Sequence, residues 1–244
     1  MRLCLALLLS LSGCAHLKPD TTPPPAEQGR YGVPVHGDLI ESSSADLNVH
    51  LDIPVFDTLP EPGRDALNAE VRKNATDALA DMQAQVAADI PELRANGFTS
   101  AYDVSAGYSV TFVNTRYLCF DQWISVYTGG AHPNTALHTY TIDLTDGSKV
   151  ALPDLFKSPD EALPRLQAQV RTKLRGIDFF EEAGSTWAIT ASALFRLDAE
   201  GLVLTFQQYE VAPYASGFPE VTLPWSSLDL AAKRDLPPVQ RANE

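Results

Sequence analysis

The sequence predicts an α+β fold in which an antiparallel sheet packs against two main helices. Strand-like segments cluster between and after two helical segments, no βαβ rhythm is present, and no internal repeat is visible. Of the 244 residues, 45% are hydrophobic and 20% are charged, which is typical of globular proteins. A chain of this length buries roughly 70% of its unfolded surface, so its core requires neither a metal nor a disulfide.

The chain is strongly acidic, with 31 Asp and Glu against 18 Lys and Arg and a formal net charge of −13. Such a surface repels the phosphates of nucleic acids, so no nucleic-acid partner is expected. An acidic surface is also not attracted to anionic lipid headgroups, so any attachment to a membrane has to be hydrophobic or covalent. No apolar run reaches the roughly 18 residues that a spanning helix needs.

The first thirteen residues have the layout of a secretory signal peptide. Arg2 supplies one positive charge, residues 3–9 are mostly apolar, and small residues precede Cys14. Residues 11–14 resemble a bacterial lipobox, which implies cleavage after residue 13 and lipidation of Cys14. Several acyl chains anchor a protein stably, because each buried CH₂ contributes about 0.8 kcal/mol. Because residue 15 is not aspartate, the resemblance implies a periplasm-facing or extracellular lipoprotein in the outer membrane of a Gram-negative bacterium; the alternative is a buried N-terminal helix.

Cleavage removes Cys4 and lipidation uses Cys14, so Cys119 is the free cysteine expected in the mature chain. No intramolecular disulfide is then expected. Cys119 lies in an apolar run, so a buried structural thiol is favoured over a reactive one.

The two ends of the mature chain are predicted to stay outside the core. Residues 14–40 contain three consecutive prolines from Pro23, which favour an extended, semi-rigid tether. Residues 233–244 are predicted to form a flexible tail.

Residues 45–112 are predicted to form a strand, a long helix and a second strand. Apolar residues alternate over 48–56, which is the pattern of a half-buried strand. From Asp65 onward they recur at spacings of three and four, which predicts a helix of about seven turns with one buried stripe. Pro91 is expected to end or bend this helix. Residues 108–113 are aromatic and β-branched, as in a strand.

The segment 115–230 is predicted to contain a second helix among further strands. Ser158 is followed by Pro159 and Glu161, which resembles a capping box with proline in the first turn, although Pro164 suggests a later regular start. Asp146 and Gly147 form a two-residue hairpin signal. Strands are expected at residues 120–127, 139–144, 149–152, 194–197, 202–209 and 220–225.

The first of two candidate binding loops carries Tyr127, Gly129, Gly130 and His132. Paired glycines between strands permit positive φ and the close approach of a ligand. His132 supplies hydrogen-bonding groups beside Tyr127. The alternative is a tight strand connection whose polar groups are already satisfied.

The second candidate loop carries Pro213, Tyr214, Ser216 and Gly217. Pro213 blocks further strand pairing, and Gly217 permits a turn before the next strand. Rigid aromatic rings with small polar residues make protein or sugar contacts at low entropic cost. The alternative is aromatic cover for the end of a sheet.

Four motifs in this order resemble the RsiV-like domain of unknown function: Tyr127–His132, Ile142–Gly147, Leu152–Phe156 and Tyr209–Gly217. That domain forms the extracellular, lysozyme-sensing part of certain anti-sigma factors and the N-terminal region of a peptidoglycan deacetylase. The resemblance spans residues 115–230, and 45–112 look like the segment that usually precedes it. The chain departs from the family at Pro133, where glycine is frequent.

The resemblance implies a binding module that faces the cell wall and is able to engage lysozyme, with the two loops as contact surfaces. We expect neither sigma-factor control nor deacetylation to carry over, since the corresponding sigma-binding and catalytic parts have no counterpart in this sequence. An acidic domain also suits a basic envelope protein such as lysozyme, because complementary charge raises association rates. Peptidoglycan is the alternative partner.

Catalytic groups are sparse in the sequence. His132 and His138 are six residues apart across a predicted turn, unlike the metal pair of a helical His-Glu-x-x-His motif, and a zinc site that adds Asp143 is the alternative. The adjacent acids Glu181 and Glu182 are typical of a solvated face. No nucleophile elbow or nucleotide-binding loop is present. The sequence therefore favours a non-catalytic module without cofactor or metal; the alternative is a peptidoglycan hydrolase or deacetylase.

Overall fold

The structure is a computed structural model that describes residues 33–176, 178–190 and 192–228. The predicted signal peptide, the lipidation at Cys14 and the predicted tail at 233–244 lie outside these residues. Within them, no helix is both long enough and apolar enough to cross a membrane.

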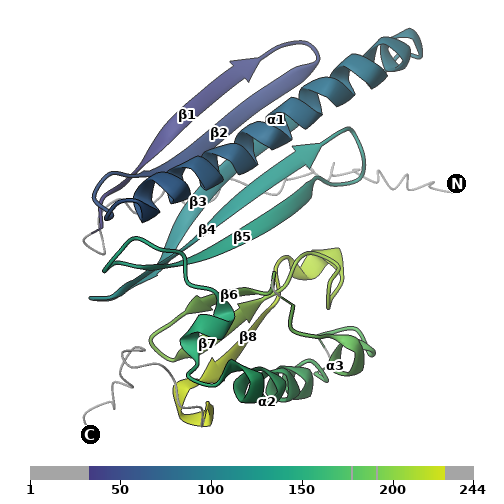
Figure 1. The fold of residues 1–244 in the computed structure, drawn as a ribbon. Coiled ribbons are helices and arrows are strands. Elements are labelled where there is room, and N and C mark those ends of the chain that lie inside the picture. The colour runs from purple at the N-terminus through teal and green to yellow at the C-terminus, as the bar shows by residue number, and fades with distance from the viewer. Residues whose placement is uncertain (1–32, 177, 191, 229–244) are drawn as a thin grey trace, which may run out of the picture.

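The strands form two sheets, of five and three strands, each accompanied by a helix (Figure 1). The prediction of one antiparallel sheet with two helices is wrong in this respect, because the later strands build a sheet of their own. The five-stranded sheet has the order β1-β2-β3-β4-β5. Its strands are β1 (Val35–Ser43), β2 (Leu47–Phe56), β3 (Tyr102–Val113), β4 (Tyr117–Tyr127) and β5 (Asn134–Asp143).

One pair of strands in this sheet is parallel. β2 and β3 are joined by the helix α1 (Gly63–Ala95) and align Leu47 with Tyr102, whereas the other neighbours are antiparallel. A 33-residue helix is about 50 Å long, which carries the chain back to the end of the sheet where β2 began. The segment β2-α1-β3 is thus a βαβ unit, which corrects both the all-antiparallel prediction and the expectation that no such unit is present.

The sequence does not predict β1, and its first residues fall within the predicted tether at 14–40. It pairs antiparallel with β2, from Val35 opposite Phe56 to Ser43 opposite Asn48. Most of its side chains are exposed or half-buried, so it lacks the apolar alternation that marks a strand in a sequence. Its backbone hydrogen bonds to β2 hold it as an edge strand instead.

α1 lies across one face of the five-stranded sheet (Figure 1). Its buried stripe matches the predicted spacing and contacts apolar residues of β2 and β4. Pro91 lies inside the helix and does not end it, since the helix continues to Ala95. The buried residues of the stripe are Leu67, Val71, Ala75, Met82 and Ile90.

The second part of the chain packs α2 (Pro159–Lys173) against the three-stranded sheet. The predicted capping box is wrong, because the Ser158 side chain makes no capping hydrogen bond and the helix simply starts at proline. The predicted hairpin at Asp146-Gly147 is reduced to an isolated bridge between Ile142 and Lys149. The remaining elements are α3 (Ala183–Thr186), β6 (Leu194–Leu197), β7 (Gly201–Thr205) and β8 (Glu220–Pro224), with 3₁₀ turns at Leu152–Leu155, Tyr214–Ser216 and Trp225–Ser227.

β4 belongs to both hydrophobic cores, because successive side chains of a strand point to opposite faces. Leu118 and Phe120 enter the core under α1, whereas Tyr117 and Cys119 enter the core built by α2 and the three-stranded sheet. Cys119 is fully buried, as predicted, and burial raises the pKa of its thiol to about 11.

Candidate functional site

The two candidate loops meet, and three of their rings form a cluster that we call the ring cluster: His132, Tyr209 and Tyr214. The imidazole of His132 stacks on the ring of Tyr214, with centroids 3.7 Å apart and planes at 18°. The Tyr209 ring lies 6.3 Å from His132 and 5.8 Å from Tyr214. The structure thus brings together residues that the sequence placed on separate loops.

Hydrogen bonds fix the orientation of the His132 ring. Its Nδ1 lies 2.9 Å from the carbonyl oxygen of Pro133, which only accepts, so Nδ1 donates. Nε2 is then the acceptor for the Tyr209 hydroxyl at 3.2 Å. Pro133, the departure from the family pattern, therefore contributes to the site through its backbone carbonyl.

Tyr209 carries the backbone strain of the site. It has φ of 65°, a conformation that costs a non-glycine residue roughly 1–2 kcal/mol. A turn holds it there: the Gln207 amide donates to the Glu210 carboxylate at 2.9 Å, and the Glu210 amide donates to the Gln207 carbonyl at 3.1 Å. The Trp187 indole also donates to Glu210, at 3.0 Å. The result is a phenol ring that is 55% exposed although its backbone is tightly held.

The loop between β4 and β5 is shaped by Tyr127 and Gly129. The Tyr127 hydroxyl donates to the carbonyl of Gly130 at 2.9 Å, so this side chain closes the loop on itself. Gly129 has φ of 89°, and a Cβ there would fall 2.9 Å from the Phe98 ring. Gly130 has open space around it. Tyr127 and Gly129 thus support the loop that presents His132.

The second loop has the turn that Pro213 and Gly217 predict. Pro213 precedes a 3₁₀ turn in which the Ser216 amide donates to the Pro213 carbonyl at 2.9 Å. Gly217 ends the turn with φ of 64°. Pro213 and Ser216 are exposed and Tyr214 is half-buried under His132, so the loop presents one stacked ring with small neighbours.

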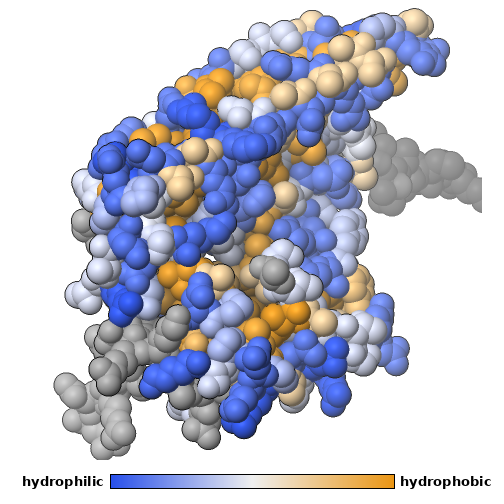
Figure 2. Space-filling model, in the orientation of Figure 1, coloured by the Kyte–Doolittle hydropathy of each residue, from blue (hydrophilic) through white to orange (hydrophobic). Residues whose placement is uncertain are grey.

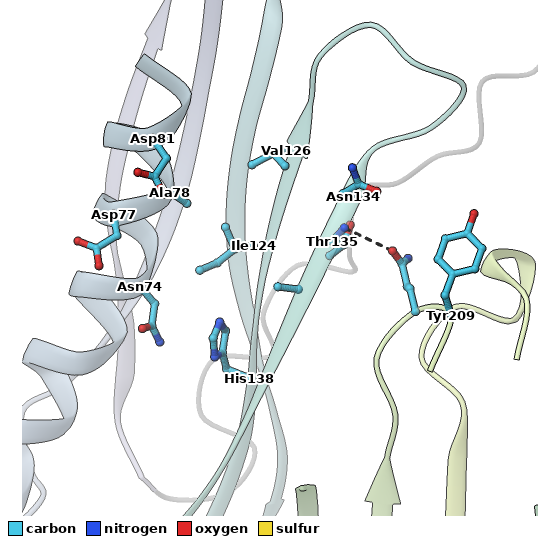
Figure 3. Close-up of a pocket in the computed structure, with 12 residues that line it drawn as sticks. Asn74, Asp77, Ala78, Asp81, Ile124, Val126, Asn134, Thr135, His138 and Tyr209 are labelled. Atoms are coloured by element: carbon cyan, nitrogen blue, oxygen red, sulfur yellow. Dashed lines mark hydrogen bonds between the residues drawn. The ribbon is translucent and has the colours of Figure 1, made fainter. Parts of the chain in front are cut away.

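A groove of about 500 Å³ begins at Tyr209 and runs between α1 and β5 (Figure 3). Its floor is apolar, with Ala78 on the helix and Ile124 and Val126 on β4. Asp77 and Asp81 stand on its helix side, and Asn134 and Tyr209 stand opposite (Figure 3). Figure 2 shows apolar patches on and beneath α1 and in the lower part of the molecule, among mostly hydrophilic residues.

The charge of the groove is negative. Burial lowers the pKa of His138, so this lining residue is uncharged at neutral pH. Asp77 pairs with Lys73 on the exposed helix surface, and Asp81 has no ion pair within the described part of the chain. At the groove's deep end, Asn74 donates to the Tyr140 hydroxyl at 2.8 Å and fixes the helix on the sheet.

The zinc hypothesis is wrong for the described residues. His132 lies in the loop before β5, His138 faces α1, and Asp143 lies at the far end of β5, where it pairs with Arg116. Five residues of strand, between His138 and Asp143, span about 17 Å. No group of three or more His, Cys, Asp or Glu suited to a metal occurs in the part that the structure covers. Glu181 and Glu182 are both exposed, as expected of a solvated face.

Sequence reasoning missed the roles of Tyr209 and of the two aspartates on α1. The sequence predicts Tyr209 as the end of a strand at 202–209, because a left-handed tyrosine has no signature in the sequence. β7 ends at Thr205, and the following residues turn to form the site. Asp77 and Asp81 are one helical turn apart on the polar side of α1, a spacing that was visible but points to no partner by itself.

Comparison with known proteins divides the chain in two. Residues 40–135 match the family model described as "Deacetylase PdaC", and residues 153–226 match the model described as "Protein of unknown function (DUF3298)". The ring cluster takes His132 from the first of these matched segments and its tyrosines from the second. No curated protein matches the chain.

Two crystal structures of DUF3298 family proteins share the fold. One, from Bacteroides fragilis NCTC 9343, is 20% identical, with 86% of this chain and 96% of that chain covered and a TM-score of 0.56. The other, from Pseudomonas aeruginosa PAO1, is 17% identical, with 84% and 96% covered and a TM-score of 0.56. At these identities the likeness establishes a mixed α/β fold dominated by the five-stranded sheet.

Proposed function

From the union of a PdaC domain and a DUF3298 domain in one chain, we propose a non-catalytic binding module of the bacterial cell envelope whose partner is a basic protein such as lysozyme. The observation that carries the proposal is the ring cluster, which joins loops of both domains at the mouth of an acidic groove. Residues far apart in the chain converge there without forming a recognisable catalytic constellation.

The surface chemistry of the site suits a protein partner. Tyrosine is enriched at binding hot spots because it supplies a large, rigid contact with a polar tip. Tyr209 and Tyr214 are held by ring contacts before any partner arrives, so little entropy is lost on binding. Pro213 and Ser216 add an exposed, stiff rim.

Charge complementarity favours a basic partner. The chain has a net charge of −13, and Asp77 and Asp81 line the groove beside Tyr209. Complementary charge accelerates encounter and makes binding weaken as salt rises. Lysozyme is the partner to which the RsiV-like resemblance points.

The proposal includes a location. The lipobox-like segment that ends at Cys14 supports a lipid anchor in the outer membrane, and the proline-rich stretch that follows supports a tether between lipid and domain. A protein held in this way meets both wall-active enzymes and peptidoglycan, so peptidoglycan is the second partner to test.

A deacetylase-related function is the second candidate. The observation that favours it is the match of residues 40–135 to the model described as "Deacetylase PdaC". It requires that the purified chain release acetate from peptidoglycan. That release should be lost in the His132→Ala variant, since His132 is the imidazole of the ring cluster.

The test measures binding of the purified full-length chain to lysozyme by surface plasmon resonance at low and moderate salt. We expect Tyr214→Ala to weaken binding by about ten-fold or more, because it removes the ring that stacks on His132. Asp77→Asn with Asp81→Asn should flatten the salt dependence, whereas Asp65→Asn, in the first turn of α1, should not. Absence of binding at low salt, or equal binding by the Tyr214 variant, would reject the proposal.

A further inference from the structure

β1 forms one outer edge of the five-stranded sheet (Figure 1). It pairs with β2 on one side, and no strand of the described residues lies on its other side. The strand is nine residues long, its register with β2 is continuous, and it contains neither proline nor lysine. Edge strands are commonly protected by such residues, by bulges or by shortness, because unpaired backbone groups are a template for another strand. We call this side of β1 the open edge.

Hydrogen bonds show which backbone groups point out from the open edge. The Ser44 amide donates to the Leu47 carbonyl at 3.0 Å, so odd-numbered residues of β2 turn their backbone groups to β1. The Tyr102 amide donates to the Asp46 carbonyl at 2.9 Å, so even-numbered residues turn theirs to β3. Odd residues of β2 pair with even residues of β1, which leaves the odd residues of β1 pointing outward. These are Val35, Gly37, Leu39, Glu41 and Ser43.

The centre of the open edge is apolar. Leu39 is the middle residue of β1, and its side chain is 52% exposed. Among the described residues, Tyr209 is the other large hydrophobic side chain that is exposed, and it belongs to the ring cluster. Leu39 lies outside that cluster, on a strand at the edge of the sheet opposite β5. An exposed leucine between free backbone groups suits a second strand with an apolar centre.

We propose that β1 pairs with β1 of a second copy of this chain, antiparallel, about a two-fold axis at Leu39. Because Leu39 is the midpoint, this register aligns all nine residues, with Leu39 opposite its copy and Gly37 opposite Glu41. The outward amides and carbonyls of the odd residues then exchange hydrogen bonds, and the two sheets become one continuous sheet. The strand is thus complementary to itself over its whole length.

The charges of β1 are compatible with this pairing. Asp38 forms an ion pair with Arg72 of α1, so its carboxylate is turned toward its own molecule. Glu41 contacts Nδ1 of His50 on β2 at 2.7 Å, so it is also turned inward. An axis at Asp38 instead of Leu39 would place two aspartates opposite one another, which is unfavourable.

The association should be weak and should strengthen as salt rises. One strand and one leucine from each copy place the interface in the transient class, below about 1,200 Å². Each copy carries a net charge of −13, and Glu41 of one copy comes near Asp52 of the other, whose carboxylate lies over Gly37. Salt screens this repulsion. Lysozyme binding is expected to weaken with salt, so the two ideas can fail separately.

The first test is sedimentation equilibrium of the purified full-length chain from low micromolar to millimolar concentration. We expect the average mass to rise from the 26.5 kDa of one chain toward twice that value, and to rise further at moderate salt. Leu39→Lys places two like charges opposite one another and should weaken association about ten-fold or more. Ala168→Lys, at an exposed position of α2, adds the same charge elsewhere and should associate as the parent does.

The second test is cross-linking by oxidation. Leu39→Cys places two cysteines opposite one another, with Cα atoms about 5.5 Å apart, which suits a disulfide. Ser43→Cys is the matched control, because its two copies would lie eight positions apart along the paired strands, about 27 Å. The native cysteines are common to both variants. We expect a reducible dimer in Leu39→Cys well above that of the parent, and no such increase in Ser43→Cys.

Three results would overturn the inference. They are a parent chain that stays monomeric at every concentration, association that Leu39→Lys leaves unchanged, and equal dimer formation by the two cysteine variants. A monomeric parent whose lysozyme binding is weakened by Leu39→Lys would assign the open edge to that partner instead. Because Leu39 is exposed, its variants should fold as the parent does, which circular dichroism checks.

Discussion

The imidazole of His132 and the phenol ring of Tyr214 stack at 3.7 Å, although His132 lies in the segment that matches the PdaC model and Tyr214 in the segment that matches the DUF3298 model. The contact therefore joins the two segments as well as forming part of the candidate site. Any partner that binds across these rings touches both segments at once, so binding and the arrangement of the segments are linked.

The stacked pair should be measurable as a coupling energy. We expect a double-mutant cycle of His132→Ala and Tyr214→Ala to give about 0.5–1.5 kcal/mol of interaction in the free energy of unfolding. Urea unfolding of the parent, both single variants and the double variant supplies the four values. Strict additivity of the two single effects would show that the rings do not stabilise one another.

Two neighbouring glycines in the same loop should differ sharply in their tolerance of alanine. Gly129→Ala places a methyl group at φ of 89° and within 2.9 Å of the Phe98 ring, so we expect a loss of about 1–2 kcal/mol of stability. Gly130→Ala meets nothing within 4 Å and should change stability by less than about 0.5 kcal/mol. Thermal unfolding of the two variants provides the comparison, and equal losses would contradict this account.

The sequence allowed the two loops to be found, because glycine and proline between strands restrict the backbone locally. It did not reveal that Tyr209 adopts a left-handed conformation, since that depends on the Gln207–Glu210 turn and on Trp187. It did not reveal β1 either, because an exposed edge strand is held by its neighbour's backbone. The parallel pairing of β2 with β3 follows from the length and path of α1, which periodicity alone does not specify.

Asp121 should make the stability of the fold depend on pH. Burial raises the pKa of this carboxyl to about 6, and its Oδ1 is buried without a hydrogen-bond partner among the described residues. Because the folded pKa lies above the unfolded one, the stabilising contribution is fully present below about pH 4 and is lost as pH rises through about 6.

Replacing the Asp121 carboxyl should therefore make the free energy of unfolding depend less on pH. We expect the free energy of unfolding of the parent to fall by about 1–3 kcal/mol between pH 4 and pH 7 relative to that of Asp121→Asn. Urea unfolding at several pH values in this window measures the difference between the two curves. Parallel curves would mean that Asp121 does not titrate differently in the folded and unfolded chains.

The last prediction concerns how the second loop is held beside the first. The side chain of Gln207 pairs with the backbone of Leu137 on β5 in the manner of a neighbouring strand: its Nε2 donates to the carbonyl at 2.7 Å, and its Oε1 accepts from the amide at 3.1 Å. Gln208 makes one longer contact, in which its Oε1 accepts from the Thr135 amide at 3.4 Å.

Gln207→Ala should consequently lower stability and weaken lysozyme binding more than Gln208→Ala does. It leaves both backbone groups of a buried residue unpaired, which costs about 1–3 kcal/mol for each unsatisfied group, and it frees the turn that carries Tyr209. We expect faster hydrogen exchange at the Leu137 amide and weaker lysozyme binding in Gln207→Ala, with small changes in Gln208→Ala. If the two variants behaved alike, the Gln207 contact would not be what positions Tyr209 against His132.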